Sequence, residues 1–254
     1  MLILLPPSEG KTPAATGAPF ALDELSFPGL NPARKEVLAA LAGASSADDA
    51  LGVLGVGASL LDEVRRNTAL DVEPAAPAHT IYSGVLYDAL GYHRMTPVQQ
   101  RRADAAVVII SGLWGAIGFA DRVPAYRLSM GVSLPETGRL SSYWKRELSE
   151  PLSRRADDEL IIDCRSSSYS SAWAAPAHQT AAVNVFQQRH GRRTVVSHFA
   201  KHTRGELARH LLTRRGAPPS TPQSLLKAAR RHWDAELVEA SGRKPYQLNI
   251  VLHG

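Results

Sequence analysis

The sequence predicts one α/β domain in which helices surround a mixed β-sheet. Short apolar segments typical of buried strands alternate with helix-like segments along the whole chain. No internal repeat or low-complexity linker divides the 254 residues, so we expect a single domain over residues 1–254. Residues 46–67 depart from this alternation and predict an inserted helix-hairpin-helix.

Apolar and β-branched residues define the predicted strands. Residues 2–5 form a short apolar run that two prolines end, and residues 106–111 are typical of a central strand. Residues 13–27, rich in Pro, Ala and Gly, are expected to form a loop. Further strands are predicted at 79–82, 160–164, 194–199 and 247–252.

Capping signals and apolar periodicity define the predicted helices. Thr96-Pro97 places a capping residue before a proline, and the segment Thr203 to Glu206 matches a capping box. The expected helices span 33–42, 97–102, 141–154, 203–214 and 222–233.

The segment 46–67 has the residue pattern of a helix-hairpin-helix. Gly55 and Gly57 follow a short apolar helix, and their backbone N–H groups would lie at the start of a second helix. Arg65 and Arg66 would add positive charge nearby. We expect these four residues to bind a nucleic-acid phosphate; the alternative is a helical hairpin with an ordinary glycine turn.

Positive charge is concentrated late in the chain. The net charge is +5, and residues 189–231 contain eleven Lys and Arg with Glu206 as the only acid. A clustered basic surface favours polyanionic partners such as nucleic acid.

Several classes of protein are excluded or disfavoured. No apolar run approaches the roughly 20 residues of a membrane span, so no membrane partner is expected. The start lacks the basic segment of a signal peptide. Cys164 is the single cysteine, which excludes an internal disulfide and fits the reducing cytoplasm, the expected location. No Cys/His or HExxH pattern is present, so we expect neither a metal nor another cofactor.

Four cations occupy positions suited to anion binding. Lys11 follows the first strand, although the P-loop pattern fails because its first glycine would fall on a leucine. Arg127 lies in a loop and is either a clamp for a phosphate or carboxylate or a structural arginine. Lys201 and Arg204 follow a predicted strand where a helix begins, and predict either an anion site or a solvated basic face.

Tyrosine and aspartate side chains are the candidate acid–base groups, together with Lys11. Tyr126 precedes Arg127, Tyr82 ends the predicted strand at 79–82, and Asp163 lies in the predicted strand at 160–164. A buried aspartate paired with Arg165 is the alternative for Asp163. The loop after Ser111 could bind a ligand at a strand end, but no serine-hydrolase elbow is present.

Several long motifs occur in order along the chain. They are LILLPPSEGKT near the start, YSGVLYDAL at 82–90, SGLWGAIGFADRVPAYRLSMG at 111–131, SHFAKHTRGELARHL at 197–211, and the hairpin. Together they resemble the YaaA family of peroxide stress-response proteins, and the resemblance spans nearly the whole chain. Two segments depart from the pattern that the resemblance implies: Pro-Pro-Ser-Glu-Gly-Lys replaces Ser-Pro-Ala-Lys, and Ser168 stands where a glutamate is expected.

The resemblance implies a compact mixed α/β fold with a positively charged cleft and a helix-hairpin-helix on its rim. It also implies a role in protecting cells from hydrogen peroxide by limiting free iron and DNA damage, and a likeness to DNA-binding proteins. The positions that match family motifs are Lys11, Gly55, Gly57, Tyr82, Gly84, Arg127, Lys201 and Arg204.

Two functions follow from these observations. The first is a cytoplasmic protein of peroxide stress that binds the DNA backbone largely without sequence specificity. The alternative is an enzyme that acts on a phosphate-bearing small molecule such as a nucleotide, using the same basic cleft. A closed pocket too narrow for a duplex favours the enzyme, and an open groove continuous with the hairpin favours DNA.

Overall fold

A mixed, mostly parallel sheet forms the centre of the molecule. The computed structural model describes residues 1–189, 192–195 and 197–253. The main sheet has the strand order β11-β12-β9-β8-β1-β3-β4, and β10 pairs with β9. Its strands are β1 (Leu2–Leu5), β3 (Val107–Ser111), β4 (Gly115–Gly118), β8 (Ile161–Asp163), β9 (Thr180–Arg189), β10 (Arg192–Val195), β11 (Asp234–Val238) and β12 (Tyr246–His253).

The direction in which the strands are added reverses between β1 and β8. Strands β3, β1, β8, β9 and β12 are parallel neighbours, with Leu4 opposite both Val108 and Asp163. The chain continues from β1 to β3 on one side, and from β8 to β9 on the other. Such a switch point, at the carboxyl ends of parallel strands, is where open α/β sheets usually bind ligands.

Helices and two small two-stranded sheets surround the main sheet. The small sheets pair β2 (Ala76–Pro77) with β5 (Arg122–Val123) and β6 (Ser133–Leu134) with β7 (Gly138–Arg139). The α-helices are α1 (Asn31–Ser46), α2 (Ala50–Leu54), α3 (Leu61–Arg66), α4 (Ala78–Ile81), α5 (Val85–Leu90), α6 (Pro97–Ala106), α7 (Leu140–Glu147), α8 (Ser149–Arg155), α9 (Ser167–Ser170), α10 (Ser197–Thr213) and α11 (Pro222–Ala229). Short 3-10 helices span Leu22–Glu24, Pro28–Leu30, Ala58–Leu60, Asn67–Ala69, Tyr92–Arg94 and Ala177–Gln179.

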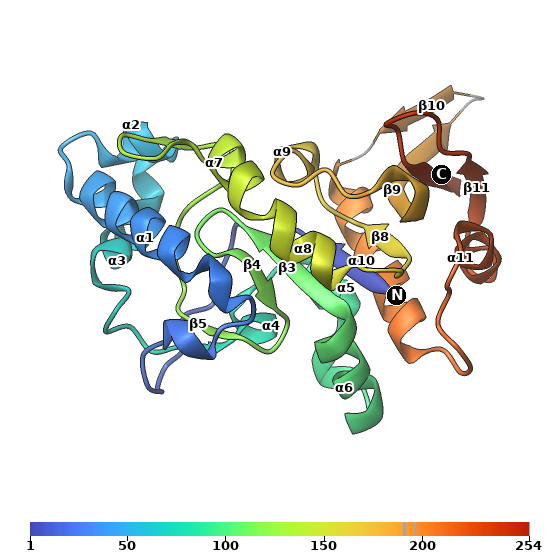
Figure 1. Cartoon of the computed structure of the whole chain (residues 1–254), viewed down its shortest axis with the longest axis horizontal. Helices are drawn as coiled ribbons and strands as arrows, with labels where there is room; N and C mark the ends of the chain where they lie inside the picture. The colour runs from blue at the N-terminus through green and yellow to red at the C-terminus, as the bar shows by residue number, and fades with distance from the viewer. Residues whose placement is uncertain (190–191, 196, 254) are drawn as a thin grey trace.

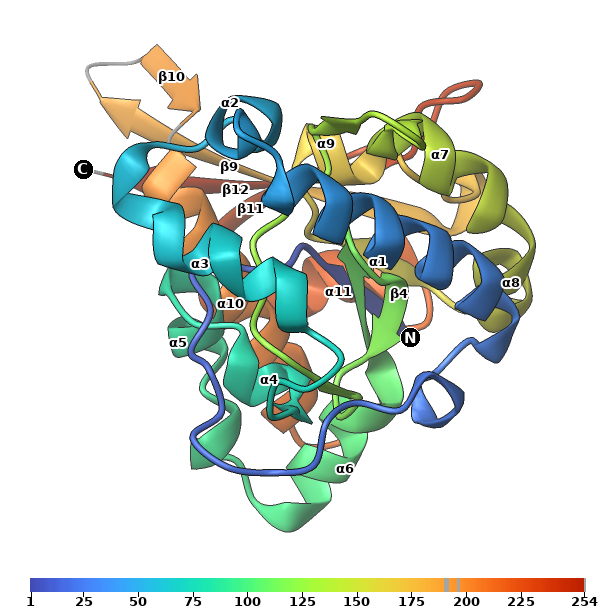
Figure 2. The same cartoon turned by 90° about the vertical axis from the view of Figure 1, so that its left-hand side faces the viewer.

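The long axis of the molecule separates two groups of elements. Figure 1 shows α1, α2 and α3 at one end, and β10, β11 and α11 at the other. Seen from the first end, α1 and α3 lie in front of the sheet (Figure 2). The switch point between β1 and β8 lies between these two groups, because both strands are central in the sheet order.

A close approach of two helices shapes the region above the switch point. Gly205 of α10 lies against the Leu86 carbonyl of α5, where a Cβ would collide with the oxygen. This contact brings the exposed Lys201 and the half-buried Arg204, both on α10, to the start of α5. The missing side chain at position 205 therefore determines how close these cations come to the strand ends.

The predicted fold class is confirmed, and most predicted strands and helices are present. Residues 2–5 and the strands near 107–111, 161–163 and 246–253 are as expected. The capping residues Thr96 and Thr221 each accept a hydrogen bond from the backbone N–H three residues on, as predicted.

Two predictions of local structure are wrong. Residues 79–82 were expected to be a strand, but Ala78–Ile81 is a turn of helix in which the Tyr82 N–H donates to the Ala78 carbonyl. A short apolar run has no period that distinguishes a strand from a buried helix. A strand was also expected over 194–199, but β10 ends at Val195 and α10 begins at Ser197.

The helix predicted to begin at Thr203 starts six residues earlier. Thr203 is buried inside α10, so it does not cap the helix. Lys201 and Arg204 consequently lie within the helix and not at its first turn. The predicted helix over 141–154 is two helices, α7 and α8, and α11 ends at Ala229, short of the predicted residue 233.

The segment 46–67 contains two short helices joined by a glycine turn. Gly55 ends α2 with φ of 64°, the left-handed conformation that glycine adopts without strain. Both α2 and α3 pack on α1. The helical pair is thus present, whereas its identification as an inserted helix-hairpin-helix is not confirmed and stays a prediction.

Candidate functional site

A cavity of about 300 Å³ lies at the carboxyl ends of β1 and β8. The loop after β1, the residue after β8, the start of α5 and the cations of α10 form its walls. Its position coincides with the switch point of the sheet, which favours a ligand site. The lining residues are Pro6, Pro7, Ser8, Glu9, Gly10, Gly84, Val85, Leu86, Tyr87, Cys164, Ser166, Tyr169, Lys201 and Arg204.

Lys201 and Arg204 supply positive charge to the cavity. The Arg204 guanidinium donates from Nε and Nη2 to the Val183 carbonyl, at 3.1 and 2.8 Å, so its position is fixed by β9. Neither cation forms an ion pair with an acid in the part of the chain that the structure describes. Both are therefore available to an anionic ligand.

Lys11 lies on the other side of the loop that lines the cavity. Its Nζ donates to the carbonyls of Ser8 and Glu9, at 2.9 and 3.4 Å. The Lys11 backbone pairs with Tyr82, which fixes the residue beside two phenol rings. The Nζ atom is 4.2 Å from the centroid of the Tyr126 ring and 5.7 Å from that of Tyr82. Burial lowers the Lys11 pKa to about 8, with Arg127 also lowering it and Glu9 and Glu63 opposing the shift.

The two predicted tyrosines form a buried hydrogen-bonded pair. The hydroxyls of Tyr82 and Tyr126 are 3.0 Å apart, and Tyr126 is 2.7 Å from Ser111 Oγ. Ser111 Oγ also accepts from the Leu113 and Trp114 N–H groups, so it is structural and buried. Burial raises the Tyr82 pKa to about 12 and the Tyr126 pKa well above its ordinary value. Both phenols are consequently neutral at physiological pH and hold the wall behind Lys11.

Arg127 connects the loop after β1 to α3. Its Nη1 donates to the Glu9 carbonyl at 3.0 Å, and its guanidinium lies 3.7 Å from the Glu9 carboxylate and 3.5 Å from that of Glu63. The backbone of Arg127 is held in turn by the Asn67 side chain. Arg127 therefore has the contacts of a structural arginine, and it keeps two carboxylates engaged beside Lys11.

The carboxylate of Asp163, a candidate acid–base group, is engaged by an arginine. Its carboxylate forms a two-pronged ion pair with Arg165, with Nε–Oδ1 at 2.8 Å and Nη2–Oδ2 at 2.7 Å. Arg165 also donates to the carbonyls of Tyr169 and Trp173. The alternative expected from the sequence, a buried aspartate paired with arginine, is the one that the structure has.

Two tyrosines outside the predicted site residues, Tyr87 and Tyr169, line the cavity. Tyr87 donates from its hydroxyl to the Pro6 carbonyl at 2.8 Å, which closes one wall. The Tyr169 hydroxyl is buried without a hydrogen bond of ordinary geometry, and Ser129 and Met130 are its polar neighbours. Burial raises the pKa of Tyr169 and holds its proton on the phenol. The position of Tyr169 after a parallel strand was the available signal.

The hairpin residues do not line this cavity. The Gly55 N–H donates to the Gly52 carbonyl, which removes it from phosphate binding. Arg65 lies 3.6 Å from Asp62, and Arg66 lies 3.7 Å from Glu73, although the Arg65 side chain stays 70% exposed. Gly57 has open space on the side where a Cβ would be.

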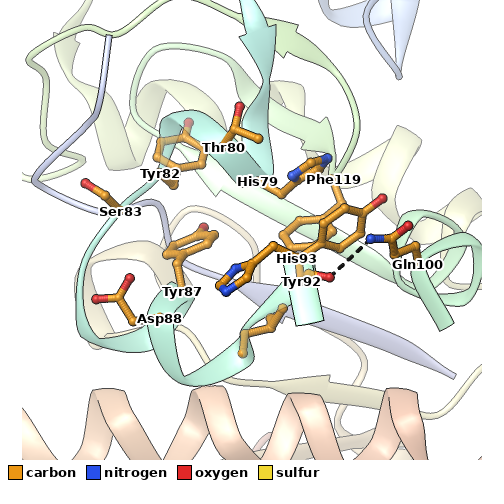
Figure 3. A pocket seen from close by; sticks show the side chains of 11 residues that line it. His79, Thr80, Tyr82, Ser83, Tyr87, Asp88, Tyr92, His93, Gln100 and Phe119 are labelled. Carbon is orange, nitrogen blue, oxygen red and sulfur yellow. Dashed lines mark hydrogen bonds between the residues drawn. The ribbon is translucent and has the colours of Figure 1, made fainter. Parts of the chain in front are cut away.

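A second, larger cavity of about 500 Å³ is lined mainly by aromatic side chains (Figure 3). The rings of His79 and Tyr92 are stacked with centroids 3.8 Å apart, and Phe119 meets the Tyr92 ring edge-on. Burial lowers the His79 pKa to about 4, so this imidazole is neutral at physiological pH. Tyr82 and Tyr87 form the side of this cavity nearest the first one, since Tyr87 lines both.

Two features are absent from residues 1–189, 192–195 and 197–253. These residues contain no cluster of three or more His, Cys, Asp or Glu that could hold a metal ion. No helix among them combines the length and apolar character that crossing a membrane requires.

Comparison with known proteins identifies the family. The model of the family described as peroxide stress protein YaaA matches residues 1–235. The chain belongs to the YaaA family. A UPF0246 protein of Streptomyces coelicolor is 42% identical over the whole chain and 99% of its own length. UPF0246 proteins of Corynebacterium efficiens and Corynebacterium glutamicum are 45% and 41% identical, each over more than four fifths of both chains.

Residues of three motifs line the cavity at the ends of β1 and β8. The loop Pro6–Gly10, the segment around Gly84, and Lys201 with Arg204 come from three separate motifs and meet there. Ser168 is exposed on α9, and its Oγ lies 3.2 Å from the Oγ of Ser166, which lines the cavity.

Proposed function

We propose that this peroxide stress protein is a cytoplasmic enzyme whose cavity at β1 and β8 binds a phosphate-bearing small molecule such as a nucleotide. One observation carries the proposal: Lys201 and Arg204 meet at a switch-point cavity and have no acidic partner among the described residues. Two unpaired cations that share one cavity are stabilised by an anion.

The size of the cavity supports a small ligand. Its volume of about 300 Å³ is within the range of small-molecule sites, whereas a duplex is far too wide to enter it. None of the four hairpin residues Gly55, Gly57, Arg65 and Arg66 lines this cavity.

The chemistry available near the cavity is proton transfer and nucleophilic attack. Lys11 has a lowered pKa beside the wall, and Tyr169, whose phenol keeps its proton, is one of the residues that line it. Lys201 and Arg204 would hold the phosphate while these groups face the rest of the ligand.

Isothermal titration calorimetry with a panel of nucleotides and inorganic phosphate tests this function. We expect binding to the wild type, and at least tenfold weaker binding to Lys201→Ala and to Arg204→Lys. Lys145→Ala, an exposed lysine on α7, is the matched control and should bind as the wild type does. Binding that is equally strong in all four proteins would contradict the proposal.

A second candidate is binding of the DNA backbone by the hairpin, supported by the turn at Gly57. The space beside Gly57 is open, so a phosphate could approach the backbone there, and the Arg65 side chain on α3 is 70% exposed. Such binding would be sequence-independent and weaken steeply with salt.

Fluorescence anisotropy with duplex, single-stranded and junction DNA at several salt concentrations tests this candidate. Salt-sensitive binding that Gly57→Glu abolishes would support it, because a carboxylate would occupy the phosphate position. Arg154→Gln, on an exposed face of α8, lowers the net charge by one unit as Gly57→Glu does, and is the control for a simple change of net charge. Equal loss in both variants would point to non-specific attraction.

A further inference from the structure

The Lys11 amine occupies an unusual position for a lysine. Its hydrogen bonds go to two neutral carbonyls, those of Ser8 and Glu9, and it forms no ion pair in the described part of the chain. The nearest carboxylates, on Glu9 and Glu63, are both engaged by Arg127. The amine is therefore held in place without a counter-ion that would fix its proton.

The aromatic surroundings of the amine stabilise a positive charge on its nitrogen. The face of the Tyr126 ring lies 4.2 Å from Nζ, and the Tyr82 ring lies 5.7 Å from it. An aromatic face stabilises a positive charge placed over it, whether an ammonium or an iminium ion. Burial lowers the Lys11 pKa to about 8, so roughly a tenth of the amine is unprotonated at pH 7.

One loop joins the Lys11 amine to the phosphate-binding cations. Ser8 and Glu9, whose carbonyls hold the amine, line the cavity that contains Lys201 and Arg204. The amine and the two cations are therefore separated by the thickness of this loop, which suits a ligand that carries its reactive group next to a phosphate.

We propose that Lys11 is a nucleophile that forms an imine with an aldehyde carried next to a phosphate group. The Nζ lone pair of the unprotonated amine attacks the carbonyl carbon, a C–N bond forms, and the C=O π electrons move to the oxygen. One proton passes from the nitrogen to this oxygen and gives a hydroxyl, and the second proton of the nitrogen joins the hydroxyl as the C–O bond breaks. Water leaves, a C=N bond remains, and atoms and charge balance without an oxidant or a reductant. This inference rests on the proposed phosphate site, and names the reactive group of its ligand.

A phosphate-bearing aldehyde has two sources that the test separates. One is a small aldehyde phosphate, and the other is the ring-opened sugar of an abasic nucleotide in DNA. Pyridoxal 5′-phosphate and a duplex oligonucleotide with one abasic site are the two probes. Each is incubated with the full chain and sodium cyanoborohydride, which converts an imine into a stable secondary amine, and the modified lysine is located by peptide mass spectrometry.

We expect at least tenfold more adduct at Lys11 than at Lys145, an exposed lysine, with one of the two probes. Adduct formation should rise between pH 6.5 and 8.5, and inorganic phosphate should suppress it. Lys11→Arg should lose the adduct while keeping the circular dichroism of the wild type, and Lys145→Arg should keep it. The probe that reacts identifies the source of the aldehyde.

An adduct spread evenly over exposed lysines with both probes, or unchanged in Lys11→Arg, would overturn the inference. Phosphate binding measured by calorimetry separates this failure from a failure of the proposed function. Phosphate binding that depends on Lys201, without an adduct at Lys11, would support the phosphate site and show that Lys11 is not a nucleophile. A Lys11 adduct that forms equally in Lys201→Ala would show that the phosphate site does not deliver the aldehyde.

Discussion

The amine of Lys11 lies over the ring of Tyr126, with Nζ 4.2 Å from the ring centroid. The two residues come from loops more than a hundred positions apart, and the Tyr82 hydroxyl completes the contact by pairing with that of Tyr126 at 3.0 Å. An aromatic ring partly replaces the water that a buried ammonium loses, but the replacement is incomplete. The balance leaves Lys11 easier to deprotonate than a lysine in water.

The stability of the protein should therefore rise with pH through the titration of Lys11. Its pKa is about 8 in the folded state, against 10.5 as a free group. Between these values the folded state has lost the proton while the unfolded state still binds it, so the free energy of unfolding increases with pH. The cost of the buried charge is constant below pH 8. The free energy of unfolding of the wild type, relative to that of Lys11→Met, should increase by about 1 kcal/mol from pH 8 to pH 9.

Urea denaturation at pH 7, 8 and 9 measures this difference. Lys145→Met, at an exposed position, is the control, and its free energy of unfolding should change with pH as that of the wild type does. The same pH dependence in Lys11→Met and the wild type would mean that the Lys11 amine titrates as in water, and would also weaken its proposed role as a nucleophile.

The ion pair of Asp163 and Arg165 should contribute to stability and not to chemistry. Both side chains are buried, and removal of one partner leaves an uncompensated charge. Asp163→Ala should destabilise the protein by about 3–5 kcal/mol, and Asp163→Ala with Arg165→Met should recover much of that loss. Chemical denaturation of both variants measures it. A single variant as stable as the wild type would show that the pair is not the structural link described here.

The central strands were predictable because they are short and apolar on both faces. Residues 2–5 and 107–111 are buried throughout, which a continuous apolar run indicates. Strand β9 was missed although Ala181, Val183 and Val185 alternate with less buried residues, the period of a half-covered strand. The polar residues at the end of the strand, 187–189, do not continue that period.

The sequence indicated single candidate residues of the site, but not which of them lie together in the folded protein. Lys11, Lys201 and Arg204 each follow or adjoin a strand, which is a local signal. The engagement of Arg127 by Glu63 depends on how α3 packs, and the position of Lys201 depends on the approach of α10 to α5. Such contacts join residues far apart in the sequence, and no local pattern encodes them.

Substitution of Gly205 should separate α10 from α5. A Cβ at this position collides with the Leu86 carbonyl, and backbone cannot move aside as a flexible side chain can. Gly205→Ala should destabilise the protein by about 1–3 kcal/mol and weaken phosphate binding, because Lys201 and Arg204 move with the helix. Gly57→Ala is the control, since nothing lies within 4 Å of the added carbon. Thermal unfolding and calorimetry test both effects, and equal stability of the two variants would contradict the close approach.

The stacked pair of His79 and Tyr92 should make the protein sensitive to mild acid. Burial lowers the His79 pKa from 6.5 to about 4, so the unfolded state takes up a proton first as the pH falls. Stability is fully present above pH 6.5 and is lost progressively toward pH 4. His79→Phe keeps an aromatic ring against Tyr92 but cannot titrate, so its stability should fall by about 1–2 kcal/mol less than that of the wild type between pH 7 and pH 5. Urea denaturation at both pH values measures this, with His93→Gln, at an exposed position of the same cavity, as the control. Equal acid sensitivity in wild type and His79→Phe would contradict this prediction, because it would show that the imidazole has the same pKa in the folded and unfolded states.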